Sequence, residues 1–355
     1  MESHKFKIKF ITPVHIGDGE EIDSLNYIVE KNYFYRINLE KFIFELSDNS
    51  KKDFMNLIDK KNMVELRAYI KANCDFNKYS VYKARLSVGF KEKYKKGFNS
   101  IKNNLAVNSF IKTGSMVPFI PGSSLKGSVR TAVLNYLLEK NRNEISKIDF
   151  FNITDNRGNR IKGSKAKIIE SAILGMPLNH FEPKFDPFRF LYISDYSLEK
   201  NNFYIGKASS KSWNMFYEVP LNIKDESLNS YGELTLSNER AEKLNTYNNN
   251  FRSIKKVTDF DLIKKACKWF YEKIALEEYD KFYKTSQDYN NEYDRINREF
   301  NNLKDNEIIL RCGKNSQFES MTLVGFENLK PKKFGKSRNI FENGLPMGWL
   351  KLIFD

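Results

Sequence analysis

The stretch VPFIPGSSLKGSVRTAVLNYLLE, from Val117 to Glu139, decides how the rest of the chain is interpreted. It predicts a short apolar strand, a tight turn at Pro121-Gly122 and a long helix. A serine oxygen can accept a hydrogen bond from a free N–H of the first helical turn, so Ser123 and Ser124 are predicted to cap this helix. Apolar residues then recur at helical spacing, at Leu125, Val129, Ala132, Val133, Tyr136 and Leu137.

Two cations lie beside the start of this predicted helix. Lys126 and Arg130 are one helical turn apart, on a face next to the apolar one. Free N–H groups and the helix dipole favour an anion at such an end, so we predict an anion site here. An ordinary strand–helix joint is the alternative. The stretch lacks the G-x-x-x-x-G-K-[ST] order of a Walker A loop, so ATP binding is not predicted.

Composition favours a globular protein with a polyanionic partner. The chain has 355 residues, of which 41% are hydrophobic, enough for a sizeable core and two domains. Lys and Arg number 59 against 45 Asp and Glu, which gives a formal net charge of +14. This excess favours nucleic acid as the partner, with an uninvolved basic surface as the alternative.

Cysteines and the N-terminus point to the reducing interior of the cell. Cys74, Cys267 and Cys312 are far apart, so neither a disulfide framework nor a zinc ribbon is predicted, and each is expected to be buried. The opening MESHKFKIKF has no apolar signal core, and no long uncharged run follows. We therefore predict a soluble, cytoplasmic protein without a membrane span, a cofactor or a metal.

The first strand leads into a loop that glycines shape. From Lys5 to Ile11 apolar residues alternate with lysines, as in a half-buried strand. The loop TPVHIGDG follows, from Thr12 to Gly19, and its glycines let backbone come close to a ligand. His15 at its centre is interpreted as a packing or hydrogen-bonding residue, with a general base or an RNA contact as the alternative.

Further elements follow from periodicity. A hairpin is predicted to turn at Lys31-Asn32, and the mixed cations and aromatics of Tyr79 to Lys96 predict either an RNA contact or a solvated linker. Asp155 to Lys167 and Lys330 to Arg338 are predicted basic loops. Helices are predicted over 42–46, 54–70, 259–300 (solvent-facing from Tyr283 on) and 318–326, and strands over 105–111, 188–198, 203–208, 215–221, 231–236, 307–311 and 345–353.

Four motifs in order resemble one known family. They are T-P-V-H-I-G-D-G, I-P-G-S-S-L-K-G-S-V-R-T-A, R-C-G-K-N-S-Q-F and P-M-G-W-L-K-L. Together they span nearly the whole chain and are similar to the RAMP superfamily of CRISPR-associated proteins, in particular to the fifth subunit of type III-A (Csm) effector complexes. The third motif departs from the family, because Asn315, Ser316 and Gln317 stand where relatives have more glycine.

The resemblance implies an α+β fold with two ferredoxin-like (RRM-like) RAMP domains and helical insertions. The domains are expected at 1–175 and 176–355, the second with a long helical segment. The implied function is that of a non-catalytic subunit that caps the backbone filament near the 3′ end of the CRISPR RNA. It would be needed for maturation of that RNA and for antiviral defence. Implied partners are the CRISPR RNA, the backbone RAMP subunit, the small subunit of the complex and host nucleases that trim the 3′ end.

Residues that match the family motifs are expected to contact RNA through its backbone and shape, because no RNP-type aromatic run is present. They are His15, Gly17, Gly19, Gly122, Ser123, Ser124, Lys126, Gly127, Arg130, Gly313 and Lys314.

Two other functions stay open at this point. A metal-independent endoribonuclease of the same superfamily would use His15 with a Lys or Tyr to drive attack by a ribose 2′-OH on the CRISPR precursor. A basic scaffold that binds only proteins is the third hypothesis.

Overall fold

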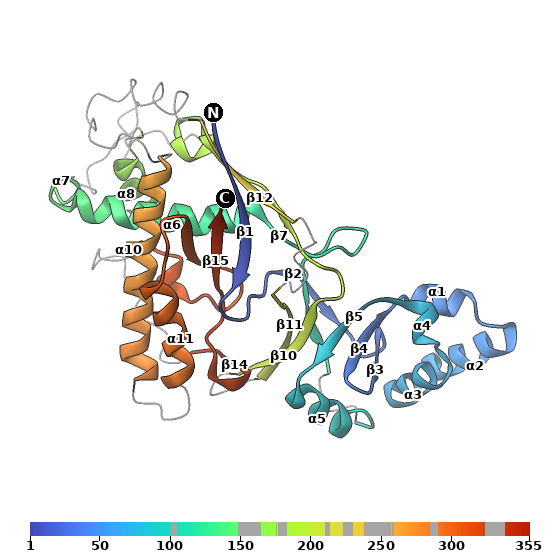
Figure 1. Cartoon of the computed structure of the whole chain (residues 1–355). Coiled ribbons are helices and arrows are strands. Elements are labelled where there is room, and N and C mark those ends of the chain that lie inside the picture. Colours follow the sequence, from blue (N-terminus) through green and yellow to red (C-terminus); the bar gives the residue numbers. More distant parts are fainter. Residues whose placement is uncertain are drawn as a thin grey trace.

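The computed structural model describes residues 1–100, 105–147, 165–174, 176, 183–209, 214–222, 230–237, 257, 259–284, 290–323 and 338–355. In this part of the chain, two large β-sheets occupy the centre and helices flank them (Figure 1). Among the described residues, no helix combines the length and apolar character that crossing a bilayer requires.

Strands and helices have the following bounds. The strands are β1 (Glu2–Phe10), β2 (Gly17–Ile22), β3 (Tyr27–Glu30), β4 (Tyr33–Ile37), β5 (Ser80–Leu86), β6 (Val107–Phe110), β7 (Phe119–Ile120), β8 (Leu191–Ile193), β9 (Tyr196–Ser197), β10 (Phe203–Ser209), β11 (Asn214–Pro220), β12 (Gly232–Leu236), β13 (Glu307–Arg311), β14 (Ile340–Phe341) and β15 (Trp349–Phe354). The α-helices are α1 (Leu39–Phe44), α2 (Asp48–Asp59), α3 (Met63–Asn73), α4 (Phe76–Tyr79), α5 (Val88–Gly97), α6 (Gly122–Lys140), α7 (Arg142–Ile145), α8 (Lys165–Ile173), α10 (Phe260–Glu278) and α11 (Asn290–Asn301).

The first sheet has the strand order of a ferredoxin-like unit. Its five antiparallel strands are arranged β13-β15-β1-β12-β8. Along the chain the unit reads β1, α6, β8, β12, α10 and β15, with β13 added at the edge. This βαββαβ arrangement confirms the predicted α+β class.

β1 lies at the centre of this sheet and defines its two faces. Phe6, Ile8 and Phe10 are buried on one face, where Phe260 of α10 stacks on the His4 ring at 3.8 Å between centroids. On the opposite face, Lys9 reaches Glu299 of α11 at 2.8 Å. Among the described residues, helices therefore cover the face that holds Phe6, and α11 reaches the other face at the end of β1 that carries Lys9.

The second sheet has the order β2-β6-β11-β10-β5-β4-β3, with β14 paired to β10. The predicted hairpin is confirmed as β3 and β4, with Lys31 in the left-handed turn at φ 53°. Helices α1 to α4 are inserted after it and project from one end of the molecule (Figure 1). They form a small core of their own around Phe42, Phe54, Leu66 and Ile70.

Several sequence-based interpretations change. Tyr79 to Lys96 is neither a linker nor a stacking surface, because it forms β5 and α5 with Tyr82 and Tyr94 buried. The long predicted helix is two helices: α10 continues as a π-helical turn at Tyr279–Tyr283, and α11 packs against α10. α11 buries Tyr293, Ile296 and Phe300 instead of facing solvent. Amphipathic spacing within a charged sequence explains that error.

The predicted helix at 318–326 is also wrong in length. Only a 3-10 turn at Phe318–Ser320 is present among the described residues of this stretch. The predicted loops at Asp155 to Lys167 and Lys330 to Arg338 lie almost entirely outside the described residues. All three cysteines are buried and free, as predicted.

The domain boundary at residues 175 and 176 stays a prediction. Strand pairing shows that such a boundary divides both β-sheets between the two predicted domains. The first sheet takes β1 from before residue 175 and β8, β12, β13 and β15 from after it. The second sheet likewise joins β5 and β6 to β10 and β11 through parallel pairs.

A buried charge cluster joins α10 to β13. Glu278, at the end of α10, pairs with Arg311 at 2.7 Å and with Arg338 at 2.8 Å, and all three residues are at most 8% exposed. The Tyr293 hydroxyl donates a further hydrogen bond to the Glu278 carboxylate at 3.0 Å. Removing one member of such a cluster leaves buried charge without its counter-charge, which costs several kcal/mol.

We predict that Glu278→Gln lowers the free energy of unfolding by about 3–5 kcal/mol, because it leaves the Arg311 guanidinium buried without a counter-charge. The matched control is Glu277→Gln on the same helix. Its exposed carboxylate meets Lys281 only at 3.5 Å, so its effect should stay within about 1 kcal/mol. Urea unfolding followed by circular dichroism compares the two, and equal midpoints would contradict the prediction.

Candidate nucleic-acid interface

Three of the four sequence motifs meet at one junction beside the first sheet. The backbone N–H of Gly348 donates to the Pro13 carbonyl at 2.8 Å, and the N–H of Lys314 donates to the His15 carbonyl at 2.7 Å. The loop after β1, the turn after β13 and the start of β15 are thus joined by direct hydrogen bonds.

Glycines at this junction let the chain pack against itself. Gly313 has φ +83°, and a Cβ there would lie 2.4 Å from the His15 carbonyl oxygen. Gly348 has φ +100°, and its Cβ would lie 2.8 Å from the Cys312 carbonyl oxygen. Close approach is therefore the reason for both glycines, and the group that approaches is protein backbone. Contact of Gly313 with RNA stays a prediction. The Lys314 side chain is exposed to solvent.

His15 has the packing and hydrogen-bonding role that the sequence favoured. It is 2% exposed, and its Nδ1 lies 2.8 Å from the Glu218 carbonyl oxygen. Its ring packs edge-on against Tyr217 at 4.8 Å between centroids. Burial lowers the pKa of His15 to about 4, so the imidazole is neutral at pH 7. Direct contact of this side chain with RNA stays a prediction.

Gly17 and Gly19 lie on the exposed strand β2, among acidic residues. Gly19 has φ +91° and open space where a Cβ would stand. Asp18, whose carboxylate accepts from Ser109 Oγ at 2.9 Å, and Glu20 flank it. Their negative charge opposes a phosphate at this loop, so the geometry does not strengthen the expectation of an RNA contact here.

The start of α6 differs from the sequence prediction. Pro121 occupies the N-cap position, and Ser123 and Ser124 lie inside the first turn, so the predicted serine caps are wrong. The N–H of Gly122 donates to the Asp195 carboxylate at 2.8 Å. A protein carboxylate thus occupies part of the position that an anion would take. A Cβ on Gly122 would lie 1.9 Å from the Ile193 carbonyl oxygen, so this glycine serves the packing of α6 on β8.

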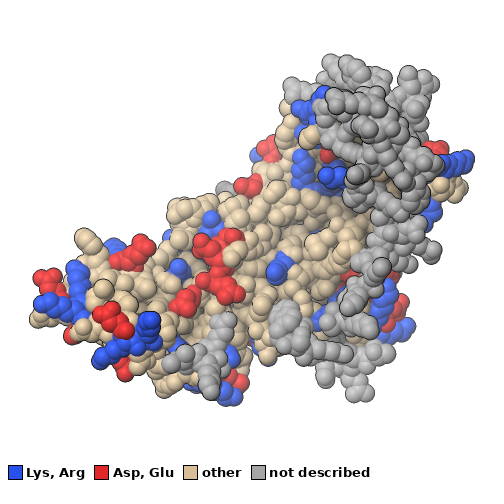
Figure 2. All heavy atoms as spheres, turned by 180° about the vertical axis from the view of Figure 1, so that it is seen from behind, with Lys and Arg blue, Asp and Glu red and all other residues tan. Residues whose placement is uncertain are grey.

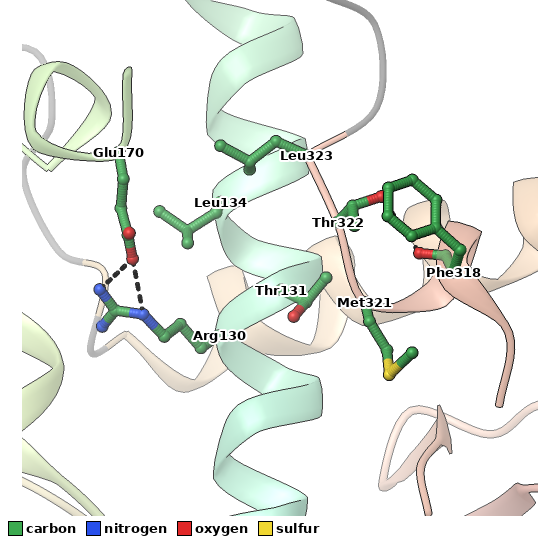
Figure 3. Close-up of a pocket in the computed structure, with 8 residues that line it drawn as sticks. All are labelled: Arg130, Thr131, Leu134, Glu170, Phe318, Met321, Thr322 and Leu323. Carbon is green, nitrogen blue, oxygen red and sulfur yellow. Dashed lines mark hydrogen bonds and ion pairs between the residues drawn. The ribbon is translucent and has the colours of Figure 1, made fainter. Parts of the chain in front are cut away.

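Arg130 is already balanced by carboxylates. Its guanidinium pairs with Glu170 and, at 2.7 Å, with Asp186, and it lies over the Phe188 ring. Figure 3 shows Arg130 turned toward Glu170 at one side of a cavity of about 440 Å³ beside α6. Apolar side chains such as Leu134 and Met321 line much of this cavity. An RNA phosphate would have to compete with two carboxylates for Arg130.

Lys126 is placed differently, one turn earlier on α6. Its ammonium lies 5.9 Å from the centre of the Tyr192 ring of β8. Burial lowers its pKa from the usual value. Ser123 and Gly127 are exposed beside it, and Ser124 is partly exposed. The structure therefore brings Ser123, Lys126 and Gly127 together on one surface and places His15, Gly313 and Gly122 in packing positions.

A surface that the sequence analysis did not single out lies on the first sheet, opposite the face that holds Phe6. On β1 its side chains are Ser3, Lys5 and Lys7. Tyr231 directly precedes β12, which pairs with β1, and Tyr192 lies on β8, one strand further out. The alternation of lysines along β1 was visible in the sequence. The tyrosines were not, because only the strand pairing places them on the same face as these lysines. We call this surface the open face; it consists of Ser3, Lys5, Lys7, Tyr192, Tyr231, Glu233 and Thr235.

On the face that Figure 2 shows, positive charge is not gathered at the end that carries α1 to α4. Figure 2 shows Lys and Arg interspersed with Asp and Glu over the end that carries α1 to α4. A single-stranded nucleic acid follows surfaces of one sign, so this end is the weaker candidate.

Comparison with known proteins places the chain among CRISPR-associated proteins. A model of the RAMP superfamily matches residues 7–310. The "CRISPR system Cms protein Csm5" of Methanocaldococcus jannaschii is 27% identical over 277 residues, which cover 74% of this chain and 60% of that protein. The protein of the same name from Streptococcus thermophilus is 28% identical over 216 residues, 55% of this chain and 57% of that protein. The matched part thus spans less than two thirds of either relative.

Two solved structures share the fold. A chain in the cryo-EM structure of a Csm–crRNA–target RNA ternary complex of a type III-A CRISPR-Cas system superposes with a TM-score of 0.73 and 19% identity, over 100% of both chains. The crystal structure of T. onnurineus Csm5 superposes with a TM-score of 0.64 and 17% identity, over 99% of this chain and 100% of that one.

We predict that Gly122→Ala destabilises the protein, because its Cβ meets the Ile193 carbonyl and the backbone of α6 or β8 has to move. Gly127→Ala on the same helix is the matched control. Open space surrounds its Cβ, and alanine favours a helix by about 1 kcal/mol over glycine. Thermal melting should fall for the first variant and hold or rise for the second. Equal melting temperatures would show that α6 does not need the close approach at Gly122.

We also predict a pH-dependent loss of stability that originates at His15. Its folded pKa, about 4, lies below the usual 6.5, so stability is complete above pH 6.5 and falls as the unfolded state takes up a proton. The loss should reach about 3 kcal/mol near pH 4. His15→Asn keeps an N–H donor without this titration, so its unfolding free energy should fall less between pH 7 and pH 4. Parallel pH profiles for the two proteins would contradict the assignment.

Proposed function

This chain belongs to the RAMP superfamily, as its four motifs indicated, and from that membership we propose that it is an RNA-binding subunit of a type III-A (Csm) CRISPR ribonucleoprotein. The observation that carries the proposal is the full-length superposition on a chain of a Csm–crRNA–target RNA complex. Within such a complex we assign it the cap of the backbone filament, near the 3′ end of the CRISPR RNA, in the cytoplasm. There it supports maturation of that RNA and antiviral defence.

The proposed partners follow from the same position. They are the CRISPR RNA, the backbone RAMP subunit and the small subunit, with host nucleases that trim the RNA 3′ end. The net charge of +14 supports a polyanionic partner. Among the residues proposed from the motifs, Lys126 and Lys314 are the cations best placed to meet phosphate, since Arg130 is paired with Glu170 and Asp186.

We propose that the subunit does not cleave RNA. A general base for a ribose 2′-OH must reach the hydroxyl and have a pKa near the working pH. His15 is 2% exposed and has a pKa of about 4, so it meets neither requirement. The ion pair of Glu218 with Lys112 is buried as well, and the Tyr82 hydroxyl donates a hydrogen bond to the Glu218 carboxylate at 2.6 Å. These contacts favour a binding role over the endoribonuclease alternative.

The test is incubation of the purified protein with a repeat-containing RNA in EDTA. We expect binding that weakens steeply with salt, because phosphate contacts release counterions, and an intact RNA after incubation. If the protein cleaves the RNA at a specific site and His15→Ala abolishes this cleavage, the protein is the endoribonuclease and not a binding subunit. If the protein neither binds nor cleaves the RNA, the remaining hypothesis is a scaffold that binds only proteins.

A tagged copy in the native host provides the control for assembly. RNA sequencing of the purified complex should recover mature CRISPR RNA together with the other subunits. In cells that lack this chain, the CRISPR RNA should remain at its untrimmed length.

A further inference from the structure

We propose that the open face of the first sheet binds single-stranded RNA by stacking bases on Tyr192 and Tyr231. This inference rests on the proposed RNA-binding function and specifies where and how the RNA is held. It also departs from the sequence-based expectation that recognition proceeds without base stacking.

Tyr192 and Tyr231 are exposed to solvent, whereas other large aromatic residues of the first sheet are buried. Tyr192 on β8 is 49% exposed and Tyr231, directly before β12, is 41% exposed. Other large rings of the same sheet, such as Phe6 and Trp349, are fully buried. An exposed aromatic ring on an open sheet is a platform on which an unpaired base can stack, whatever its identity.

Strand register places both rings on the same face. Tyr192 is paired with Thr235, and Tyr231 precedes Thr235 by four residues, so the side chains of 231, 233 and 235 point to one side. Ser3 confirms the common face, because its hydroxyl contacts both Glu233 and Thr235. Along the strand the two rings are separated by about 13 Å, which leaves room for nucleotides between them.

Each tyrosine has a lysine beside its ring. The Lys7 ammonium lies 4.8 Å from the centre of the Tyr231 ring, and the Lys126 ammonium lies 5.9 Å from that of Tyr192. Lys5 is also exposed, on β1 opposite Glu233. A base on each ring and a phosphate near each ammonium is the combination that single-strand binding surfaces use. Two carboxylates lie near these lysines: Glu233, to which Ser3 donates a hydrogen bond, and exposed Asp355, whose N–H donates to the Lys5 carbonyl.

The positive surface continues past Lys7. Lys9, the next outward residue of β1, borders a cavity of about 610 Å³ between α11 and the sheet. Arg295, Arg298 and Lys304 are exposed at this cavity, while Glu299 and Glu307 pair with Lys351 at 2.9 Å. Phosphates that leave the open face therefore meet further cations. This continuity favours an extended RNA strand over a globular protein partner, because charged residues are depleted at the centre of a protein–protein interface.

The test compares two fluorescent probes of equal length, an oligouridine RNA and an abasic RNA with the same phosphates, in anisotropy titrations at several salt concentrations. Tyr192→Leu with Tyr231→Leu should weaken oligouridine binding at least about tenfold and leave abasic binding and the salt slope unchanged. Tyr192→Phe with Tyr231→Phe should keep wild-type affinity. Lys7→Ala should flatten the salt slope by roughly 0.7 for both probes, because it removes a phosphate contact.

Phe44→Leu is the matched control. Phe44 is 81% exposed on α1 with the Lys51 ammonium 5.8 Å from its ring, so it repeats the lysine–aromatic pair away from the open face. Its affinity for both probes should equal that of the wild type, and circular dichroism checks that each variant is folded.

The outcomes separate this inference from the function on which it rests. Unchanged oligouridine affinity in the folded leucine double variant, or an equal loss on the abasic probe, overturns stacking and leaves RNA binding in place. Loss of a protein subunit from the purified complex, with RNA affinity unchanged, shows that the face binds protein. A wild-type protein that binds neither probe overturns the RNA-binding function itself.

Discussion

The position of β1 in the middle of the first sheet is the constraint on which the fold depends. A central strand has to pair its N–H and C=O groups on both sides, since water cannot reach them. Phe6 therefore lies opposite Gly232 on one side and Phe354 on the other. A Cβ on Gly232 would come within 2.2 Å of the Phe6 ring, so this pairing accepts only glycine there without movement. The buried Phe6 ring thus constrains how β12 and β15 pair with β1.

Buried charges hold the helices and loops to this framework. Glu278 joins α10 to β13 through Arg311, and Glu218 on β11 joins β5 and β6 through Tyr82 and the N–H of Phe110. Such pairs add little net stability, because both partners lose their hydration. They do penalise any other packing, because a displaced partner would leave the remaining charge buried alone. The buried charges therefore select one packing arrangement more than they add to the free energy of unfolding.

The motif glycines and the proposed RNA surface have separate tasks. The glycines at 313 and 348 shape a junction in which protein backbone meets protein backbone, so their place in the chain is explained without RNA. What remains exposed on the first sheet is a row of lysines and tyrosines whose spacing follows from strand pairing. The junction defines the geometry of the sheet, and the sheet presents the side chains.

Local patterns determined most of the elements. Alternation along β1, the hairpin at Lys31 and the apolar stripe of α6 could be read from the sequence because each depends on neighbours a few residues away. The motif order also indicated the superfamily. Interactions between distant residues were decided by tertiary structure alone: Asp195 meets the N–H of Gly122, and Glu170 and Asp186 neutralise Arg130. The open face belongs to the same class, because Tyr192, Tyr231 and Lys7 come to share one face only when β8, β12 and β1 pair. Charge balance and exposure are properties of the assembled surface, whereas periodicity is a property of the chain.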